Sequence, residues 1–271
     1  MILIDGEELK VEHFPDGTQR LKLDPFDGSV IDWIYESDTE WATLYYIVNH
    51  LRSYYPNCYL RLKLRYMHNG RMDRTKNTDE VFTLKWFTKF INDLNFSEVE
   101  IFDPHSNVTP ALIDRCKVVW PDNIVNKIIQ ELDKQNPYND VLLYFPDKGA
   151  YSKYSDMFNE HTQLYGEKVR DWNTGQILGL ELRDPSDYLT CYTGGCAAIL
   201  MIDDICSHGG SLYYSAKLLK DYFPEAKIYS YTSHTENEFP TLQKAFDEGL
   251  IEKHFTTNSL YRGQNNKIEL C

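Results

Sequence analysis

The residues best placed by type and spacing to do chemistry lie in one stretch, Ala198 to Ser211, with the sequence AILMIDDICSHGGS. An apolar run precedes the adjacent acids Asp203 and Asp204, and the glycines Gly209 and Gly210 follow them. Two carboxylates at the end of a buried strand can accept hydrogen bonds from the hydroxyls of a ribose, and the amides of a glycine-rich turn that opens a helix can hold a phosphate. The alternative is an ordinary strand and turn in which an acid caps the helix.

The elements that must position these residues follow a regular alternation. Strand-like runs rich in Ile, Val, Leu, Tyr or Phe occur at Leu60–Tyr66, Val99–Phe102, Val141–Phe145, Ala197–Ile202 and Lys227–Thr232. Helix-length stretches occur at Thr39–Arg52, Thr78–Leu94, Ile124–Lys134, Ser211–Tyr222 and Thr241–Gly249. This alternation predicts an α/β fold of mainly parallel sheets flanked by helices, with ligands at the carboxyl ends of the strands.

A polar, proline-bearing stretch, Leu132–Asp140, separates two halves of the chain in which strand-like and helix-length segments alternate in a similar way. It predicts two domains, Met1–Glu131 and Leu132–Cys271. The segment Tyr151–Tyr192 is long, polar and weakly periodic, so we expect an irregular, mobile lid there.

Composition limits the classes of function. The net charge of −13 repels phosphate backbones and anionic lipids, and no basic patch or long apolar run offsets it, so neither nucleic acid nor membrane is an expected partner. The six cysteines are scattered without a Cys-x-x-Cys pair, which favours a reducing, cytoplasmic location over a disulfide framework or zinc site. No P-loop or Gly-x-Gly-x-x-Gly fingerprint occurs.

The Asp-Asp and Gly-Gly-Ser pattern resembles the ribose-phosphate motif shared by phosphoribosyltransferases and by ribose-phosphate diphosphokinases, the phosphoribosyl diphosphate synthetases. Other segments resemble the synthetases in particular, and they occur in the family's order. These are Phe14-Pro-Asp16-Gly17, the Tyr66 to Arg74 segment with Arg71 and Asp73, Phe102-Asp103-Pro-His105, and Phe145-Pro-Asp147-Lys-Gly149. Lys168 and Arg170 resemble the Lys-x-Arg of the family's catalytic flexible loop.

The resemblance implies two type I phosphoribosyltransferase domains and transfer of the β,γ-diphosphate of ATP to the 1-hydroxyl of a ribose 5-phosphate moiety. It implies that Lys168 and Arg170 are catalytic and that Phe14, Asp16, Arg71, Asp73 and His105 bind ATP. It assigns the phosphorylated ribose to Asp147, Asp203, Asp204, Ser207, His208, Gly209, Gly210 and Ser211. Mg²⁺ is the implied cofactor, with His105, Asp147 and Asp203 at the metal, of which the two acids supply hard oxygen contacts.

The sequence departs from the family pattern in places that bear on the acceptor. Ser207 and His208 stand where the family's loop carries Asp and Thr around the 5-phosphate, while Thr18 and Met72 differ near the ATP motifs. The pattern looks closest to short, divergent bacteriophage-encoded members, some of which resemble enzymes that diphosphorylate ADP-ribose during NAD rebuilding. Ribose 5-phosphate and ADP-ribose are therefore both expected acceptors, and a virus-encoded chain would act in the host cytoplasm.

Two other functions stay open. A phosphoribosyltransferase needs the ribose-phosphate loop but not the Phe14, Arg71 or Lys168 segments, and a non-catalytic regulatory homologue would be expected to have lost His105, Asp147 or the Lys-x-Arg pair. The resemblance also implies a homodimer or homohexamer in which the Phe14 loop completes a neighbour's ATP site, an active site between the domains, and a return of residues near Thr256 to Ser259 to the first domain.

Overall fold

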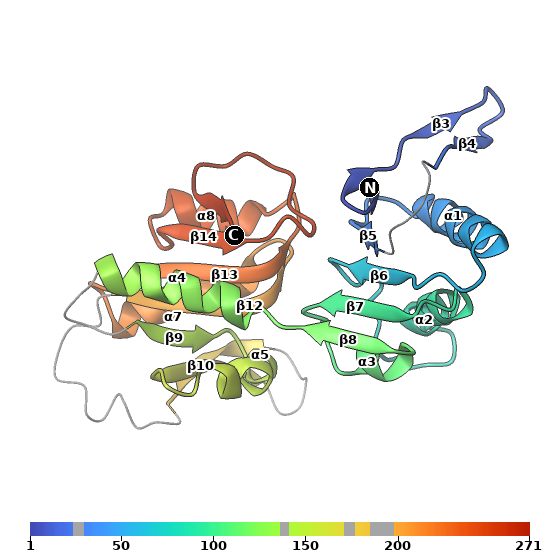
Figure 1. Cartoon of the computed structure of the whole chain (residues 1–271). Coiled ribbons are helices and arrows are strands. Elements are labelled where there is room, and N and C mark those ends of the chain that lie inside the picture. The colour runs from blue at the N-terminus through green and yellow to red at the C-terminus, as the bar shows by residue number, and fades with distance from the viewer. Residues whose placement is uncertain (24–29, 136–140, 171–176, 185–197) are drawn as a thin grey trace. The chain divides into compact units, whose positions relative to one another are not determined.

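The computed structural model describes residues 1–23, 30–135, 141–170, 177–184 and 198–271, apart from the side chains of residues 168–170 and 177–179. The chain forms two compact units, Met1–Trp120 and Pro121–Cys271 (Figure 1). This boundary differs from the one expected after residue 131, which falls inside helix α4 (Asp122–Gln135). The helix belongs wholly to the second unit because its buried Val125 and Ile128 pack into that unit's core.

The first unit contains a six-stranded sheet in the order β2-β1-β5-β6-β7-β8. Strands β5 to β8 are parallel neighbours, whereas β1 pairs antiparallel with β2 and with β5. The strands are β1 (Ile2–Ile4), β2 (Glu7–Glu8), β5 (Val30–Trp33), β6 (Arg61–Leu64), β7 (Glu98–Phe102) and β8 (Cys116–Val119). A separate hairpin pairs β3 (Val11–His13) with β4 (Gln19–Leu21).

The helices of the first unit bury one face each, as their apolar spacing requires. They are α1 (Glu40–Tyr54), α2 (Thr83–Asp93) and the short α3 (Val108–Leu112). In α1 the buried positions Leu44, Ile47, Val48 and Leu51 recur at intervals of three and four residues. These side chains pack with the buried residues of β5, β6 and β7 into one core, which holds the parallel strands in register.

The second unit contains a seven-stranded sheet in the order β11-β10-β9-β12-β13-β14-β15, parallel except for the β10–β11 pair. Its strands are β9 (Leu142–Phe145), β10 (Gln163–Arg170), β11 (Ile177–Arg183), β12 (Ala198–Cys206), β13 (Lys227–Thr235), β14 (Lys253–Thr256) and β15 (Ile268–Leu270). The central strand β12 is almost continuously buried, as expected for a parallel strand covered on both faces.

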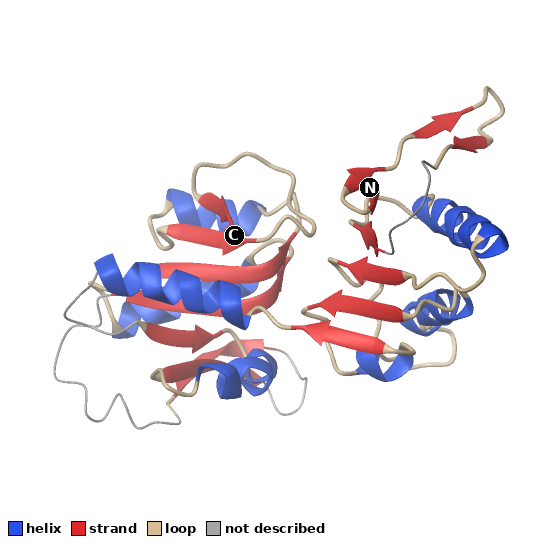
Figure 2. Ribbon diagram, viewed as in Figure 1, coloured by secondary structure: helices blue, strands red, loops and turns tan. Residues whose placement is uncertain are grey.

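Helices cover this sheet on two sides (Figure 2). They are α4, α5 (Lys148–Tyr154), the 3₁₀ turn η1 (Ser155–Phe158), α7 (Gly210–Tyr222) and α8 (Pro240–Asp247). In one core cluster, α4 and α5 pack against strand residues that include Leu200 and Ile202 of β12. In a second cluster, α7 and α8 pack against Ile199 and Met201 of the same strand. The alternating side chains of β12 therefore contribute to both layers, which confirms the expected α/β architecture.

The segment expected to be an irregular lid, residues 151–192, is in large part regular. It includes the end of α5, η1 and the antiparallel strands β10 and β11. Gly166 interrupts the apolar pattern of β10. A glycine is required there because a Cβ at this position would clash with the hydroxyl of Tyr144 and would lie 2.8 Å from the carbonyl oxygen of Pro146. The irregular expectation is therefore wrong for these strands, while residues 171–176 and 185–192 lie outside the described part of the chain.

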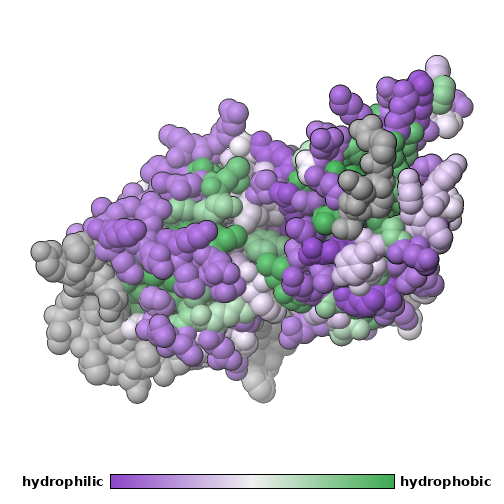
Figure 3. Space-filling view, viewed as in Figure 1, coloured by the Kyte–Doolittle hydropathy of each residue, from purple (hydrophilic) through white to green (hydrophobic). Residues whose placement is uncertain are grey.

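Hydrophilic side chains cover most of the face shown in Figure 3, with smaller hydrophobic areas between them. Acids outnumber bases by 41 to 28 in the sequence, so the chain carries a net negative charge. None of the helices in the described ranges combines the length and the apolar character needed to cross a lipid bilayer.

A buried hydroxyl network ties β13 to β14. Nδ1 of His254 lies 2.8 Å from Oγ of Ser230, and Nε2 lies 3.2 Å and 2.9 Å from the hydroxyls of Thr232 and Thr235. Thr235 also donates to Thr256 at 2.7 Å. Complete burial lowers the pKa of His254 to about 3, so the imidazole is neutral in the folded protein.

The neutral His254 makes stability depend on pH. Between its ordinary pKa of about 6.5 and its folded value of about 3, the unfolded chain binds a proton that the folded chain does not. We expect the free energy of unfolding to fall as pH falls through this window, by up to about 1.4 kcal/mol per pH unit from this one group. Denaturant titrations of wild type and His254→Asn at several pH values measure the difference in slope.

The exposed His13 provides the matched control, because His13→Asn removes a histidine outside the network. Equal slopes for wild type and His254→Asn would contradict a buried, neutral imidazole.

Candidate functional site

The two acids of the motif lie inside β12 and not after it. The strand was expected to end at Ile202, but its pairing with β13 continues from Asp203 opposite Thr232 to Cys206 opposite Thr235. The acids therefore occupy the carboxyl-terminal half of the central strand, where Asp204 is buried and Asp203 is partly buried. Pairing with β13 before and after the acids fixes their backbone at the carboxyl edge of the sheet.

A tight turn joins this strand to α7, a helix of 13 residues. Gly209 is its N-cap residue and has a left-handed φ of 85°, a region that side chains other than glycine rarely enter. An added Cβ would lie 2.5 Å from Cβ of Leu242 and 2.6 Å from its amide nitrogen. Gly210 has open space around it instead. The first glycine of the pair is required by backbone geometry, and the second leaves room beside the first turn of the helix, whose amides have no partner within the helix.

Carboxylates gather at this edge. Burial and the neighbouring charges of Asp204 and Asp147 raise the pKa of Asp203 well above the ordinary aspartate range. The amide of Asp204 donates to Oδ1 of Asp203 at 2.9 Å. Asp147 follows β9, the parallel neighbour of β12, and its Oδ1 caps α5 by accepting from the amides of Gly149 and Ala150 at 2.9 and 3.1 Å.

Lys153 balances part of this negative charge. Its Nζ lies 3.5 Å from Oδ2 of Asp204, and both side chains are largely removed from solvent. The lysine comes from α5, whose N-terminus Asp147 caps, so one short helix places both groups. Asp204 therefore has a cation beside it, whereas Asp203 is the acid whose pKa burial and neighbouring charges raise.

The other residues expected at the phosphate surround the turn. Ser207 donates through Oγ to Oε2 of Glu236 at 2.6 Å. The side chains of His208 and Ser211 are exposed, and the carbonyl oxygen of His208 accepts from the amides of Thr241 and Leu242 at 2.9 and 3.1 Å. The structure therefore brings Asp147, Asp203, Asp204 and the residues of the turn to one edge of the second unit.

The residues expected at ATP lie in the first unit. Asp73 is buried and accepts from Arg74 at 2.8 and 3.1 Å. Those bonds lower the pKa of Asp73 most, and the hydroxyl of Ser106 and the charge of His105 act in the same direction, against the opposing effect of burial. Asp73 and His105 therefore lie near each other, in the loops that follow the parallel strands β6 and β7. Arg71 is exposed on the first of these loops.

The loop after β7 has an unusual backbone. Asp103 is fully buried and adopts a left-handed φ of 42°, which is uncommon for a residue with a side chain. Its amide donates to the carbonyl oxygen of Val119 at 2.9 Å, which joins the loop to the neighbouring strand β8. This arrangement leaves the side chain of His105 exposed two residues later.

Phe14 and Asp16 occupy the turn of the β3–β4 hairpin. Gly17 has a φ of 85°. Two backbone bonds of 2.9 Å close the turn: the amide of Gly17 donates to the carbonyl oxygen of Phe14, and the amide of Phe14 donates to the carbonyl oxygen of Thr18. The amide of Thr18 donates to Oδ1 of Asp16 at 2.9 Å and lowers the pKa of that carboxyl. The side chain of Phe14 is 51% exposed, so the hairpin presents an aromatic ring to the surroundings.

Lys168 and Arg170 lie on β10, opposite Leu180 and Ile177 of β11. Their backbone thus belongs to an antiparallel edge of the second sheet, while their side chains lie outside the described part of the structure. Their assignment to catalysis stays a prediction.

Sequence reasoning missed Lys153 and Glu236. Lys153 lies six residues after the Asp147 cap, on a helix too short to show an apolar period. Glu236 follows β13 by one residue, so a systematic inspection of residues at the carboxyl ends of the parallel strands would have included it. Its pairing with Ser207, 29 positions earlier, has no local signal.

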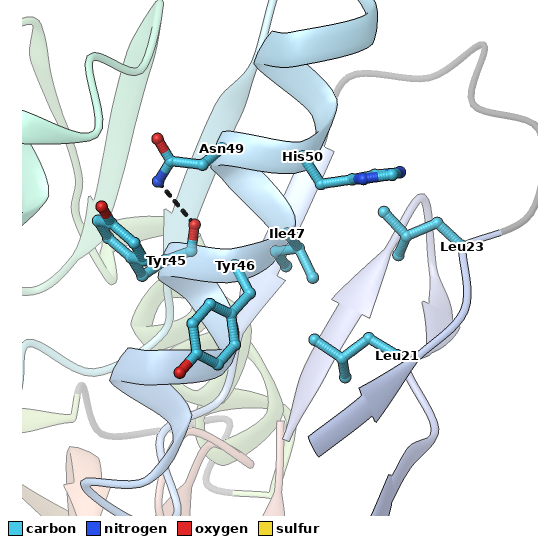
Figure 4. Close-up of a pocket in the computed structure, with 7 residues that line it drawn as sticks. All are labelled: Leu21, Leu23, Tyr45, Tyr46, Ile47, Asn49 and His50. Carbon is cyan, nitrogen blue, oxygen red and sulfur yellow. Dashed lines mark hydrogen bonds between the residues drawn. The ribbon is translucent and has the colours of Figure 1, made fainter. Parts of the chain in front are cut away.

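A pocket of about 340 Å³ lies elsewhere in the first unit, between the hairpin and α1 (Figure 4). Its lining consists of Leu21, Leu23, Tyr45, Tyr46, Ile47, Asn49 and His50. The amide of Asn49 donates to the carbonyl oxygen of Tyr45 within the helix. The lining includes none of the residues expected to bind ATP, and its apolar character does not suit a triphosphate.

The donor set at the edge of the second sheet suits a hard cation. Within the described ranges, no three acids, histidines or cysteines converge to form a metal cage of their own. Mg²⁺ commonly uses one or two carboxylates and completes its shell with water and substrate phosphates. Asp203, with its raised pKa and acidic neighbours, fits such a partial site, because a cation would relieve the repulsion among the carboxylates.

The two glycines of the turn allow a matched test. Gly209→Ala places a Cβ at a left-handed φ and against Leu242, so we expect a loss of about 2 kcal/mol or more in the free energy of unfolding. Gly210→Ala has open space and a helical position, and its effect should stay within about 1 kcal/mol. Urea unfolding of both variants measures this. Similar losses for the two would show that the turn does not adopt this conformation.

No family model matches the chain, and no curated protein does. Among solved structures, phosphoribosylpyrophosphate synthetase from Mycobacterium smegmatis superposes with a TM-score of 0.74 at 12% identity, over 97% of this chain and 85% of that chain. APRTase from Giardia lamblia gives a TM-score of 0.37 at 14% identity, over 58% and 82%, which is too low to carry an argument. The first likeness shows the fold: two units with parallel-dominated, helix-flanked sheets of the type I phosphoribosyltransferase kind.

Proposed function

We propose that this chain is an enzyme that transfers the β,γ-diphosphate of ATP, with Mg²⁺, to the anomeric 1-hydroxyl of a ribose 5-phosphate moiety and releases AMP. The acceptor is ribose 5-phosphate or ADP-ribose. The observation that carries the proposal is the acid pair of β12 followed by the Gly209 turn and the start of α7, in a chain whose fold matches a solved phosphoribosylpyrophosphate synthetase along 97% of its length.

The acceptor half of the proposal rests on the second unit. Asp203 and Asp204 are fixed at the edge of the sheet and suited to accept hydrogen bonds from the ribose hydroxyls. The amides of the first turn of α7 suit the 5-phosphate, because unpaired N–H groups and the helix dipole both favour an anion. Together these groups orient the sugar so that its 1-hydroxyl faces the incoming diphosphate.

The donor half rests on the first unit. His105, Asp73 and Arg71 lie on the loops after β6 and β7, and the hairpin carries Phe14 and Asp16. We assign these residues to ATP, with Phe14 as the aromatic contact for the adenine. When bound, Mg²⁺ would neutralise phosphate charge during transfer, and His105, Asp147 and Asp203 are the residues proposed to hold it.

The half-exposed Phe14 also supports assembly as a homodimer or a homohexamer. A large aromatic ring at the end of a hairpin is well placed to contact another copy of the chain. In this proposal the hairpin of one chain completes the ATP site of its neighbour.

The first test is AMP release from Mg·ATP by the purified protein, in parallel with ribose 5-phosphate and with ADP-ribose, with product masses recorded. The proposal predicts AMP in step with a gain of one diphosphate on at least one acceptor. Omission of Mg²⁺ provides the control. If no AMP is released with either acceptor, a regulatory homologue is favoured. Consumption of phosphoribosyl diphosphate with a base would instead indicate a phosphoribosyltransferase.

A second test concerns Lys168. A cation that contacts the transferred group mainly in the transition state contributes to kcat more than to ground-state binding, so Lys168→Ala should lower kcat by about 100-fold or more and change KM for ATP little. Steady-state kinetics measure both constants. Lys127→Ala, on the exposed face of α4, is the control with an unchanged kcat. A normal kcat in Lys168→Ala would remove this lysine from the catalytic group.

A further inference from the structure

The turn between β12 and α7 is joined at two points to Glu236, the residue that follows β13. The hydroxyl of Ser207 donates to Oε2 of Glu236 at 2.6 Å, and the amide of Glu236 donates to the carbonyl oxygen of Cys206 at 2.9 Å. A hydrogen bond to a charged acceptor is short and stronger than one between neutral groups. One residue therefore restrains both the side chain and the backbone of the turn.

Glu236 is itself presented from a rigid base. Thr235, its neighbour in sequence, is fully buried and bonds to the hydroxyl of Thr256 and to Nε2 of His254, at 2.7 and 2.9 Å. The last strand pair of β13 with β12 places Thr235 opposite Cys206. The position of the carboxylate relative to the turn is thus set by the interior of the sheet and not by a free loop.

The far side of the turn is restrained as well. The carbonyl oxygen of His208 accepts from the amides of Thr241 and Leu242, at the start of α8, and Gly209 lies against Leu242. The connection from β13 to α8 therefore holds the turn at both of its ends. Glu236 is the charged member of these restraints.

The bond to Glu236 also decides what Ser207 can do. A serine hydroxyl has a single proton to donate, and here that proton points to the carboxylate. While the bond lasts, the hydroxyl donates nothing to a phosphate in the turn, and the amides at the start of α7 must supply the donors. The carboxylate also lies close enough to Cys206 that its charge adds to the burial that raises the pKa of that thiol to about 12.

We infer that Glu236 is a positioning residue for the acceptor phosphate: by holding Ser207 and Cys206 it keeps the turn in the conformation whose amides receive the anion. The inference rests on the proposed function, because the phosphate of the sugar acceptor is what the turn would bind. Glu236 need not touch the substrate, so its loss should weaken acceptor binding and leave the chemical step largely intact.

The test compares Glu236→Ala, Glu236→Gln and Ser207→Ala with wild type, using ribose 5-phosphate and ADP-ribose as acceptors. For Glu236→Ala we expect KM for the acceptor to rise about tenfold, equivalent to about 1.4 kcal/mol, with kcat and KM for ATP changed less than about twofold. Glu236→Gln keeps an accepting oxygen and should recover most of the loss. Adding Ser207→Ala to Glu236→Ala should cause little further change in the acceptor KM, because each substitution removes the same bond between Ser207 and Glu236.

Glu238→Gln is the matched control, since it removes a charge from an exposed residue two positions along the chain. A second readout, amide hydrogen exchange of peptides that cover residues 203–212, needs no turnover. It should be faster in Glu236→Ala and Ser207→Ala than in wild type and Glu238→Gln.

The outcomes separate the inference from the function. If wild type releases AMP with an acceptor but Glu236→Ala has the KM and the exchange of Glu238→Gln, the positioning role is wrong and the proposed function stands. If wild type neither binds nor uses either acceptor, the function fails and the role of Glu236 in acceptor binding fails with it. Faster exchange in Glu236→Ala would then show that the bond between Glu236 and Ser207 only stabilises the turn. Loss of kcat with an unchanged acceptor KM would also overturn the inference.

Discussion

Repulsion between carboxylates at the end of a buried strand is the constraint on which the second unit depends. Asp203 and Asp204 lie next to each other in β12, with Asp147 close by on the neighbouring strand's loop, and burial raises the pKa of Asp203. Such a cluster disfavours its own ionisation unless other groups oppose it. Lys153 opposes the charge of Asp204, and the amide of Asp204 donates to Asp203. An edge with this arrangement is prepared to accept hydroxyl donors or a cation.

The surrounding structure makes that arrangement rigid. Behind the acids, β13 and β14 share a network of buried hydroxyls around a neutral His254, in which both ring nitrogens have partners. Ahead of them, the turn after β12 is bonded to Glu236 and to the start of α8. A site held in this way needs little reorganisation when a ligand arrives, which is the usual structural basis of tight orientation. The same bonds explain why a polar end of the sheet is compatible with a stable interior.

Much of the fold follows from apolar periodicity. All five predicted strands and all five predicted helices occur, because each carries either a continuous buried run or an apolar face with a helical period. Strands β1 to β5, β8, β10, β11, β14 and β15 and the short helices α3 and α5 were not predicted, because each is short or lacks a clear apolar period. In β10, Gly166 breaks the alternation where Tyr144 approaches. The two units divide between Trp120 and Pro121 and not after residue 131, because α4 packs on the core of the second unit through contacts that its own sequence does not specify.

The sequence by itself determined the local chemistry: an acid pair after an apolar run, a glycine where φ is positive, and capping by Asp147, since each depends on a few adjacent residues. Only the tertiary structure decided that the acids lie within the strand, that Lys153 opposes Asp204, and that Glu236 holds Ser207. These contacts join residues separated by tens of positions. They exist because parallel strands place their carboxyl ends side by side, and the spacing of residues along the chain carries no record of that proximity.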